Sequence, residues 1–262
     1  MNIHSSAEVH PDARIGNNVE VGPFSFIAKN VVIGDNTWIG PNVTIMDGSI
    51  IGSNCRIFPG TVIAGIPQDP KFAGEITTAE IGNYTTLREY VTVNRGSRAK
   101  GKTTIGDYCH LMAYVHIAHD CIVGNHCVIA NCVNIAGEVV VFDWATIGGM
   151  SGIHQFSRVG AHSMISGLSK MNKDVPPYVK AGRDPISYLR LNIVGLKRRG
   201  FAPEKINEIQ DIYRIIFQQG RNTSRALDFI ERNFRSTPER DEILRFIRDS
   251  KRGIIKGYKT NR

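Results

Sequence analysis

A six-residue period runs through most of this chain and restricts its possible folds more than any other feature. Every sixth residue from Ile3 is a large aliphatic one, at Ile3, Val9, Ile15, Val21, Ile27, Ile33, Ile39, Ile45, Ile51, Ile57 and Ile63, then Ile81, Leu87 and Val93, then from Ile105 to Ile165. A second series, two residues earlier in each repeat, holds only small or β-branched residues. An α-helix repeats every 3.6 residues and cannot keep this phase. Short strands joined by tight turns and wound into a coil can keep it.

Three consecutive repeats are predicted to make one turn of the coil. Asn18, Asn36 and Asn54 recur once in every three repeats, the return expected of a triangular coil with one strand on each side. Glycine and asparagine are expected in the turns, because both adopt positive φ at little cost. Stacked coils would lie about 4.8 Å apart and satisfy each other's backbone groups. The pattern therefore predicts a mainly β chain wound as a parallel β-helix, with the coil ending near Ile165.

Two polar insertions and a different C-terminal pattern divide the chain. The insertions, residues 64–80 and 94–104, interrupt the coil but leave its phase intact, and we assign residues 1–186 to the β-helix domain. Helical patterns then span residues 187–199, Pro203 to Gly220, 223–235, and a stretch that starts at Thr237-Pro238. Residues 187–262 are thus expected to form an all-α domain, which can cover the open end of the coil.

The net charge of +8 is concentrated in the tail. Residues 190–262 hold 18 Lys or Arg and 9 Asp or Glu, a net of +9, which leaves 14 and 15 for the rest of the chain. This favours either an acidic partner or a solvated basic surface. We expect no nucleic-acid partner. We find no secretory signal and no apolar run near the roughly 20 residues of a membrane helix, and five cysteines without a CxxC pair fit a reducing cytoplasm.

The stretch AYVHIAHDCIVGNHC, residues 113–127, looks like a metal site when it is taken alone. The repeat changes that interpretation, because the small inward position of each repeat is where four of the five cysteines fall, namely Cys55, Cys109, Cys121 and Cys127. They are expected to fill the interior as small apolar side chains. We therefore expect no metal site, and no cofactor is indicated.

The turn of three repeats places His119 beside Gly137 on adjacent coils. A histidine next to an accessible backbone N–H is a suitable pair of general base and oxyanion donor. Asp120 follows in the sequence and could orient the imidazole. The alternative is that these are hydrated surface residues, and the spacing alone leaves both possibilities open.

The repeat resembles that of the hexapeptide-repeat acyltransferases, whose fold is a left-handed parallel β-helix. Within that family the chain is similar to the UDP-N-acetylglucosamine 3-O-acyltransferases, through QDPKFAGE (68–75), LREYVTVNRG (87–96), HIAHDC (116–121), IGGMSGIHQF (147–156), DVPPYV (174–179) and GLKRRGF (195–201). The resemblance implies transfer of an (R)-3-hydroxyacyl group from acyl carrier protein to the 3-hydroxyl of UDP-N-acetylglucosamine, the first step of lipid A biosynthesis. It also implies a homotrimer with active sites between subunits, and no cofactor beyond the carrier's phosphopantetheine.

The same resemblance assigns roles to particular residues. His119 would be the general base, Asp120 would hold its other nitrogen, and the Gly137 N–H would receive the oxyanion. Substrate contacts would come from Gln68, Lys71, His116, His154, Gln155, Asn192, Arg198 and Arg199. Gly167 stands where the family limits acyl length, and a glycine there predicts a long chain. Glu138 and Val194 depart from the family pattern, which leaves the acceptor open between the N-acetyl and the 3-amino sugar.

Three other readings remain at this point. A sister enzyme acylates a 2-amino group, but it has an N-terminal uridine-binding domain, for which we expect no room before Ile3. A coil similar to a carbonic anhydrase would bind zinc at the interface between subunits, with His110, His116 and His119 as candidate ligands. A non-enzymatic coil would bind an anionic partner through its basic tail.

Overall fold

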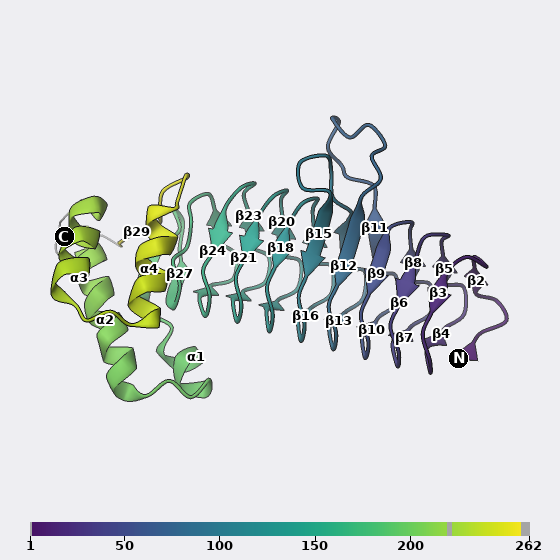
Figure 1. The fold of residues 1–262 in the computed structure, drawn as a ribbon, viewed down its shortest axis with the longest axis horizontal. Coiled ribbons are helices and arrows are strands. Elements are labelled where there is room, and N and C mark those ends of the chain that lie inside the picture. The colour runs from purple at the N-terminus through teal and green to yellow at the C-terminus, as the bar shows by residue number, and fades with distance from the viewer. Residues whose placement is uncertain (1, 219–221, 258–262) are drawn as a thin grey trace.

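The computed structural model describes residues 2–218 and 222–257, and it shows a long coil capped at one end by helices (Figure 1). The coil is a left-handed parallel β-helix with three sheets as its walls. The chain starts at the open end of the coil and reaches the helices only after the last coil (Figure 1). The predicted fold class is therefore confirmed.

Each wall collects every third strand of the coil. The first sheet holds β1 (Asn2–Ile3), β4 (Glu20–Val21), β7 (Trp38–Ile39), β10 (Arg56–Ile57), β13 (Thr86–Leu87), β16 (His110–Leu111), β19 (Val128–Ile129), β22 (Thr146–Ile147), β25 (Met164–Ile165), β27 (Val179–Gly182), β28 (Ser187–Leu191) and β29 (Lys256–Gly257). The second holds β2 (Glu8–Val9), β5 (Phe26–Ile27), β8 (Thr44–Ile45), β11 (Val62–Gly65), β14 (Thr92–Asn94), β17 (His116–Ile117), β20 (Asn134–Ile135), β23 (Gly152–Ile153) and β26 (Lys170–Met171). The third holds β3 (Arg14–Ile15), β6 (Val32–Ile33), β9 (Ser49–Ile51), β12 (Thr78–Ile81), β15 (Lys102–Ile105), β18 (Ile122–Val123), β21 (Val140–Val141) and β24 (Arg158–Val159).

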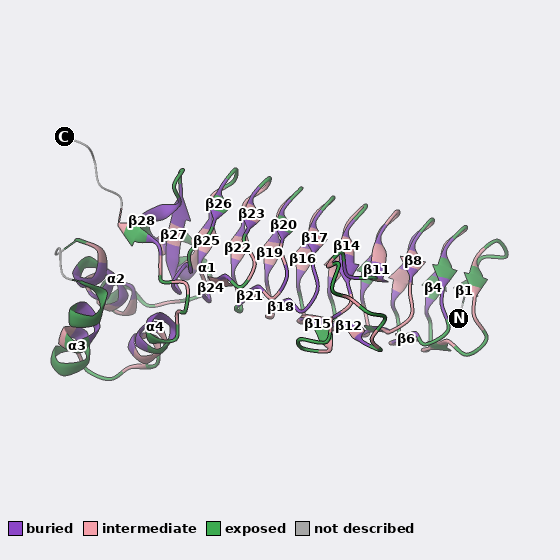
Figure 2. Cartoon of the chain, turned by 90° about the horizontal axis from the view of Figure 1, so that it is seen from above, coloured by how far each residue is buried: buried purple, intermediate pink, exposed green. Residues whose placement is uncertain are grey.

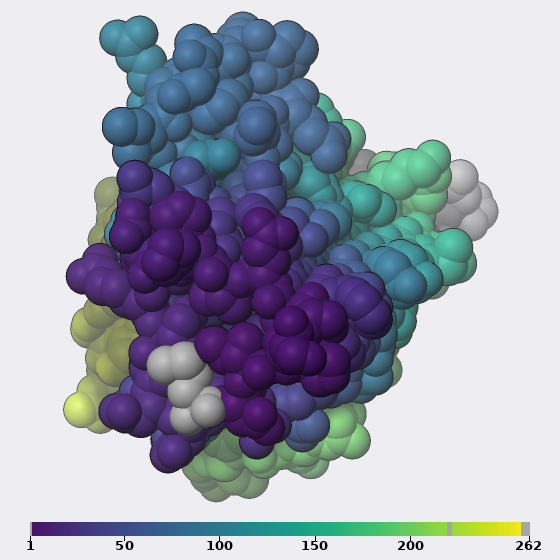
Figure 3. Space-filling view, turned by 90° about the vertical axis from the view of Figure 1, so that its right-hand side faces the viewer, coloured from purple at the N-terminus to yellow at the C-terminus, as the bar shows by residue number. Residues whose placement is uncertain are grey.

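The register between neighbouring strands confirms that three repeats make one turn. Asn2 pairs with Glu20, which lies three repeats further along the chain. Arg56 pairs with Thr86, five repeats on, and Thr86 pairs with His110, four repeats on. The first insertion therefore lengthens its turn by two whole repeats and the second by one, so the phase is kept. Both insertions stand out from the coil on the same side (Figures 1 and 3).

The interior is filled by the two series found in the sequence. The aliphatic series is buried from Val21 onward, and Figure 2 shows buried residues in coil after coil. Cys55, Cys109, Cys121 and Cys127 are buried free thiols, as their small inward position predicts, whereas Cys132 is exposed. Val9 and Ile15 are only partly buried, because they lie in the open first coil.

The turns differ from the expectation of glycine and asparagine. The left-handed residue, three positions after each buried aliphatic, is often aromatic, as at Tyr84, Tyr108 and Trp144. These rings stack on one another along one corner, with centroids 4.8 Å apart between Tyr84 and Tyr108. Stacking offsets the cost of positive φ.

The glycine that follows many of the aliphatic residues has another role. A Cβ on Gly34 would come within 2.6 Å of the Ser53 backbone nitrogen, so the glycine permits close stacking of the coils.

The C-terminal region corrects two expectations. Met171 continues the buried series on β26, so the coil extends past Ile165. Residues Ser187–Leu191 form β28, which pairs with β27 as an antiparallel hairpin, instead of the start of a helix. The C-terminal region thus combines helices with two strands of the first sheet. The domain limit at 262 and the predicted helix end at Gly220 lie outside the described residues.

Four helices follow the hairpin: α1 (Ile193–Arg198), α2 (Pro203–Gln218), α3 (Thr223–Asn233) and α4 (Pro238–Arg248). Thr237 caps α4 as predicted, with its hydroxyl accepting from the Arg240 N–H. The cap on the coil is fixed by polar contacts, since the buried Tyr213 hydroxyl donates to the Pro177 carbonyl at 2.6 Å. No described helix is long and apolar enough to cross a membrane.

Candidate active site

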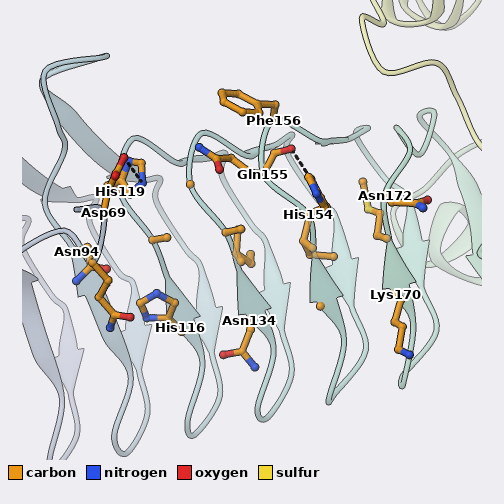
Figure 4. Close-up of a pocket in the computed structure, with 18 of the residues that line it drawn as sticks. Asp69, Asn94, His116, His119, Asn134, His154, Gln155, Phe156, Lys170 and Asn172 are labelled. Atoms are coloured by element: carbon orange, nitrogen blue, oxygen red, sulfur yellow. Dashed lines mark hydrogen bonds and ion pairs between the residues drawn. The ribbon is translucent and has the colours of Figure 1, made fainter. Parts of the chain in front are cut away.

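A groove of about 990 Å³ runs along the outer face of the second sheet (Figure 4). Its floor comes from β14, β17, β20, β23 and β26. The first insertion, with Gln68 and Lys71, lines one end, and Asp184 and Pro185 in the β27–β28 turn line the other. The groove therefore spans several coils and is long enough for an extended ligand.

His119 and Gly137 are neighbours on adjacent coils at one edge of the groove. The Glu138 N–H donates to the His119 carbonyl at 3.0 Å, which fixes the two corners side by side. A Cβ on Gly137 would come within 2.6 Å of the His119 Nε2, so the imidazole lies directly against the glycine. Within the described part of the chain, the Gly137 N–H donates to no protein acceptor. A base and a free donor are thus held together.

Asp120 orients the imidazole. The His119 Nδ1 lies 2.8 Å from the Asp120 Oδ2, and the Asp120 side chain is fully buried. The second insertion surrounds this carboxylate: the Ser97 hydroxyl donates at 2.6 Å and its N–H at 2.9 Å, and the Lys100 N–H donates at 3.1 Å. A carboxylate can only accept, so Nδ1 carries the proton and the Nε2 lone pair is left to act as a base.

The pKa of Asp120 is lowered. Burial alone would raise it, but hydrogen bonds from Ser97, His119 and Lys100 outweigh burial and hold the pKa below its usual range. Asp120 is therefore ionised at neutral pH and can stabilise an imidazolium when His119 takes up a proton.

This lowered pKa makes a stability prediction. Because the folded-state pKa of Asp120 is below the unfolded-state value, the stabilisation is fully present above about pH 3.9 and is lost as the pH falls through the folded-state pKa. We expect wild type to exceed Asp120→Asn by about 1–3 kcal/mol in unfolding free energy at pH 7. Denaturant unfolding at pH 7 and pH 3, with the exposed Asp12→Asn as control, measures the difference. An advantage that stays undiminished at pH 3 would contradict it.

Asp69 is a site residue that the sequence reasoning missed. Its Oδ2 lies 4.0 Å from the His119 Nε2, and both residues line the groove (Figure 4). The Lys71 N–H donates to the Asp69 Oδ1 at 3.0 Å and so fixes the carboxylate. Asp69 stands inside the motif QDPKFAGE, but only the fold of the insertion shows that it reaches His119.

Five predicted substrate contacts line the groove, at Gln68, Lys71, His116, His154 and Gln155. The His116 Nδ1 is 2.7 Å from the Thr92 hydroxyl, and burial lowers the pKa of His116, so its ring is neutral at pH 7. The His154 Nδ1 donates to the Gln155 carbonyl at 3.0 Å.

Three other predicted substrate contacts and the predicted acyl-length residue, Gly167, do not line the groove of a single chain. The buried Asn192 donates through Nδ2 to the His162 carbonyl at 2.9 Å, Arg198 is exposed, and Arg199 lies 5.4 Å from the Trp144 ring centroid. Gly167 is exposed at the corner between β25 and β26. Their roles toward substrate stay predictions.

The fold also separates the candidate zinc ligands within a single chain. His110 lies on the first sheet and His116 on the second, so these histidines do not share a face. Among residues 2–218 and 222–257, no group of three or more His, Cys, Asp or Glu side chains is arranged to hold an ion.

Comparison with known proteins identifies the family. The family described as UDP N-acetylglucosamine O-acyltransferase, domain 2, matches residues 174–255, and the bacterial transferase hexapeptide family matches residues 30–65 and 102–137. The acyl-[acyl-carrier-protein]--UDP-N-acetylglucosamine O-acyltransferase of Burkholderia lata is 41% identical over 199 residues, 74% of this chain and 76% of the relative. That of Thiobacillus denitrificans is 42% identical over 191 residues, 72% of this chain and 74% of the relative.

Solved structures agree over almost the full length. A UDP-N-acetylglucosamine acyltransferase from Bacteroides fragilis is 50% identical with a TM-score of 0.95, covering 97% of this chain and 99% of its own. The enzyme from Francisella novicida is 36% identical with a TM-score of 0.94, covering 97% and 94%. With the coil, both insertions and the C-terminal helices all matched, the chain belongs to the UDP-N-acetylglucosamine O-acyltransferase family.

Proposed function

We propose that this chain transfers an (R)-3-hydroxyacyl group from acyl carrier protein to the 3-hydroxyl of UDP-N-acetylglucosamine, with His119 as general base. This is the first step of lipid A biosynthesis. The observation that carries the proposal is the contact between the His119 imidazole and Gly137, whose N–H has no acceptor in the described chain. The names of the two relatives given above state O-acylation of UDP-N-acetylglucosamine from an acyl carrier protein, which supports the donor and the acceptor of the proposal.

The proposed reaction proceeds in two proton transfers. The His119 Nε2 takes the proton of the sugar 3-hydroxyl as the oxygen attacks the thioester carbonyl. The Gly137 N–H donates to the oxyanion that forms, and the Asp120 carboxylate, 2.8 Å from Nδ1, stabilises the imidazolium. The carbon–sulfur bond then breaks, the imidazolium returns its proton to the pantetheine thiolate, and the ester remains on the sugar. A positioned base typically supplies 10²–10⁴-fold in rate.

A homotrimer would complete the site. A row of exposed apolar side chains follows the corner between the first and second sheets, namely Tyr90, Tyr114, Met150 and Leu168. Exposed apolar rows of this kind mark interfaces. A neighbouring coil packed there would cover the groove and could bring its own Arg198 and Arg199 toward the substrate. These features support the trimer implied by the family resemblance.

The donor is a soluble protein that carries its acyl chain on phosphopantetheine, so the proposal needs no other cofactor. Carrier proteins are acidic, and the tail of this chain has a net charge of +9, from 18 cationic and 9 anionic residues. Opposite charges would speed the encounter of the two proteins. We place the reaction in the cytoplasm, in keeping with the free thiols of the chain.

The function is tested by product analysis. The purified protein, incubated with UDP-N-acetylglucosamine and a mixture of (R)-3-hydroxyacyl carrier proteins of different chain lengths, is expected to give one main product by mass spectrometry. Its acyl chain should be long, because Gly167 puts no side chain at that corner. Mild alkali should release the acyl group, as it does from an ester. An alkali-stable product would be an amide and would contradict O-acylation of the N-acetyl sugar.

A further inference from the structure

The second insertion contacts Asp120 but does not line the groove of a single chain. Ser97 and Lys100 both hydrogen-bond to the buried Asp120 side chain, and neither is among the residues that line the groove. A side chain in this position has no access to a ligand in the groove. Any effect of the insertion on the reaction must therefore pass through Asp120 and His119.

The insertion is held in a tight loop by its own backbone. A Cβ on Gly96 would come within 2.2 Å of the Lys102 nitrogen, so a glycine is needed for the loop to close. The Gly101 N–H donates to the Ser97 carbonyl at 2.8 Å. The buried Thr77 hydroxyl donates to the Gly96 carbonyl at 2.7 Å. Ser97 is thus fixed relative to the wall of the coil.

The Ser97 hydroxyl has a defined direction. Its oxygen accepts from the Ala99 N–H at 3.2 Å, so its own proton is free to point at the Asp120 Oδ2, 2.6 Å away. The same Oδ2 lies 2.8 Å from the His119 Nδ1. The Oδ1 accepts from the N–H groups of Ser97 and Lys100 at 2.9 and 3.1 Å. Each carboxylate oxygen therefore has two donors, and Ser97 donates to both oxygens.

We infer that Ser97 is a positioning residue of the reaction: its hydroxyl fixes the Asp120 carboxylate and, through it, the tautomer and orientation of the His119 ring. Its effect on rate rests on the proposed function. Among the described residues, Asp120 is the one hydrogen-bond partner of that ring. A carboxylate held only through Oδ1 could turn its Oδ2 away from Nδ1. The imidazole would then lose the contact that keeps Nδ1 protonated and leaves Nε2 free to accept.

Steady-state kinetics tests the effect on rate. Ser97→Ala should lower kcat about 10-fold, the loss of one charge-assisted hydrogen bond. KM for both substrates should change less than about 2-fold, because Ser97 does not line the groove. Ser97→Thr keeps the hydroxyl and should restore most of kcat, since the φ of Ser97 is not left-handed. Ser236→Ala is the matched control: its hydroxyl also donates to an aspartate, Asp241, at 2.6 Å, but on the exposed surface of the cap, and kcat should match wild type.

A double-mutant cycle separates positioning from a general loosening of the site. In Asp120→Ala the Ser97 hydroxyl has no carboxylate to hold, so adding Ser97→Ala should lower kcat by less than about 2-fold further. An equal loss of kcat in both backgrounds would show that Ser97 does not act through Asp120 and would overturn the inference. A change confined to KM would overturn it as well.

Nitrogen NMR of histidine-labelled protein tests the positioning without turnover. The signals of the His119 ring are identified as those absent from His119→Ala. In alkaline buffer, wild type should carry the ring proton on Nδ1, and Ser97→Ala should share it between the two ring nitrogens. A wild type that transfers no acyl group would end the proposed function, but this comparison would still test the role of Ser97. The same pure Nδ1 tautomer in wild type and Ser97→Ala would contradict the inference.

Discussion

Replacement of His119 by alanine is expected to lower kcat for acyl transfer by about 10²–10⁴-fold, the contribution of a positioned general base. The sugar hydroxyl is a weak acid, so its attack depends on a base that removes its proton. KM for both substrates should change little, because the imidazole acts mainly in the transition state. The rate of ester formation, followed with a labelled acyl carrier protein, measures the effect.

A matched control separates the loss of the base from the loss of any histidine. His10→Ala removes an imidazole that is 41% exposed near the open end of the coil, and it should leave kcat at the wild-type value. His119→Ala should also unfold at nearly the same denaturant concentration as wild type. A variant at His119 that retains more than a tenth of wild-type kcat would remove His119 from the role of base.

Gly137→Ala is expected to reduce kcat by about 10²-fold, the cost of a misplacement of about 1 Å at a reacting centre. The added Cβ would lie 2.6 Å from both the Nε2 and the Cε1 of His119. The ring cannot yield easily, because Asp120 holds its Nδ1 at 2.8 Å and the second insertion holds Asp120. The imidazole must therefore leave its position against the oxyanion donor. Single-turnover kinetics at saturating substrate measure this loss directly.

The Gly137→Ala variant is expected to keep the wild-type fold, which can be checked separately from its activity. The left-handed corner residue is Glu138, so alanine at position 137 requires no unusual backbone angles. Thermal unfolding and the size of the assembly should therefore stay close to wild type while activity falls. Wild-type kcat in this variant would show that the ring has another position from which it can work.

The coil could be predicted from the sequence because one requirement recurs in every repeat. Each turn must fill the same narrow interior, so the aliphatic residue and the small residue return at fixed intervals. The predicted end of the coil and the predicted start of the helices were wrong, because the filling of the interior changes in this part of the chain. Met171 fills the aliphatic position with an unbranched side chain, which hid the last strand of the second sheet. Residues 187–191 lie under the helices as well as beside β27, and their buried apolar residues gave no clear period.

The site was predicted only as far as the coil determines it. The turn of three repeats was enough to bring His119 against Gly137, because both stand on the regular wall. The insertions have no period, so the sequence did not show that Ser97 binds Asp120 or that Asp69 reaches the imidazole. The position of Arg199 could not be predicted either, since it depends on how the C-terminal cap docks on the last coil.

The register of the second sheet has a consequence for the evolution of substrate size. The floor of the groove advances by one strand spacing with every turn, from His116 through Asn134 and Gly152 to Lys170. A duplication or deletion of three whole repeats within it would leave every buried side chain in place, yet shift the two ends apart or together by about 4.8 Å. Enzymes with this fold can therefore change the length of the groove only in whole coils.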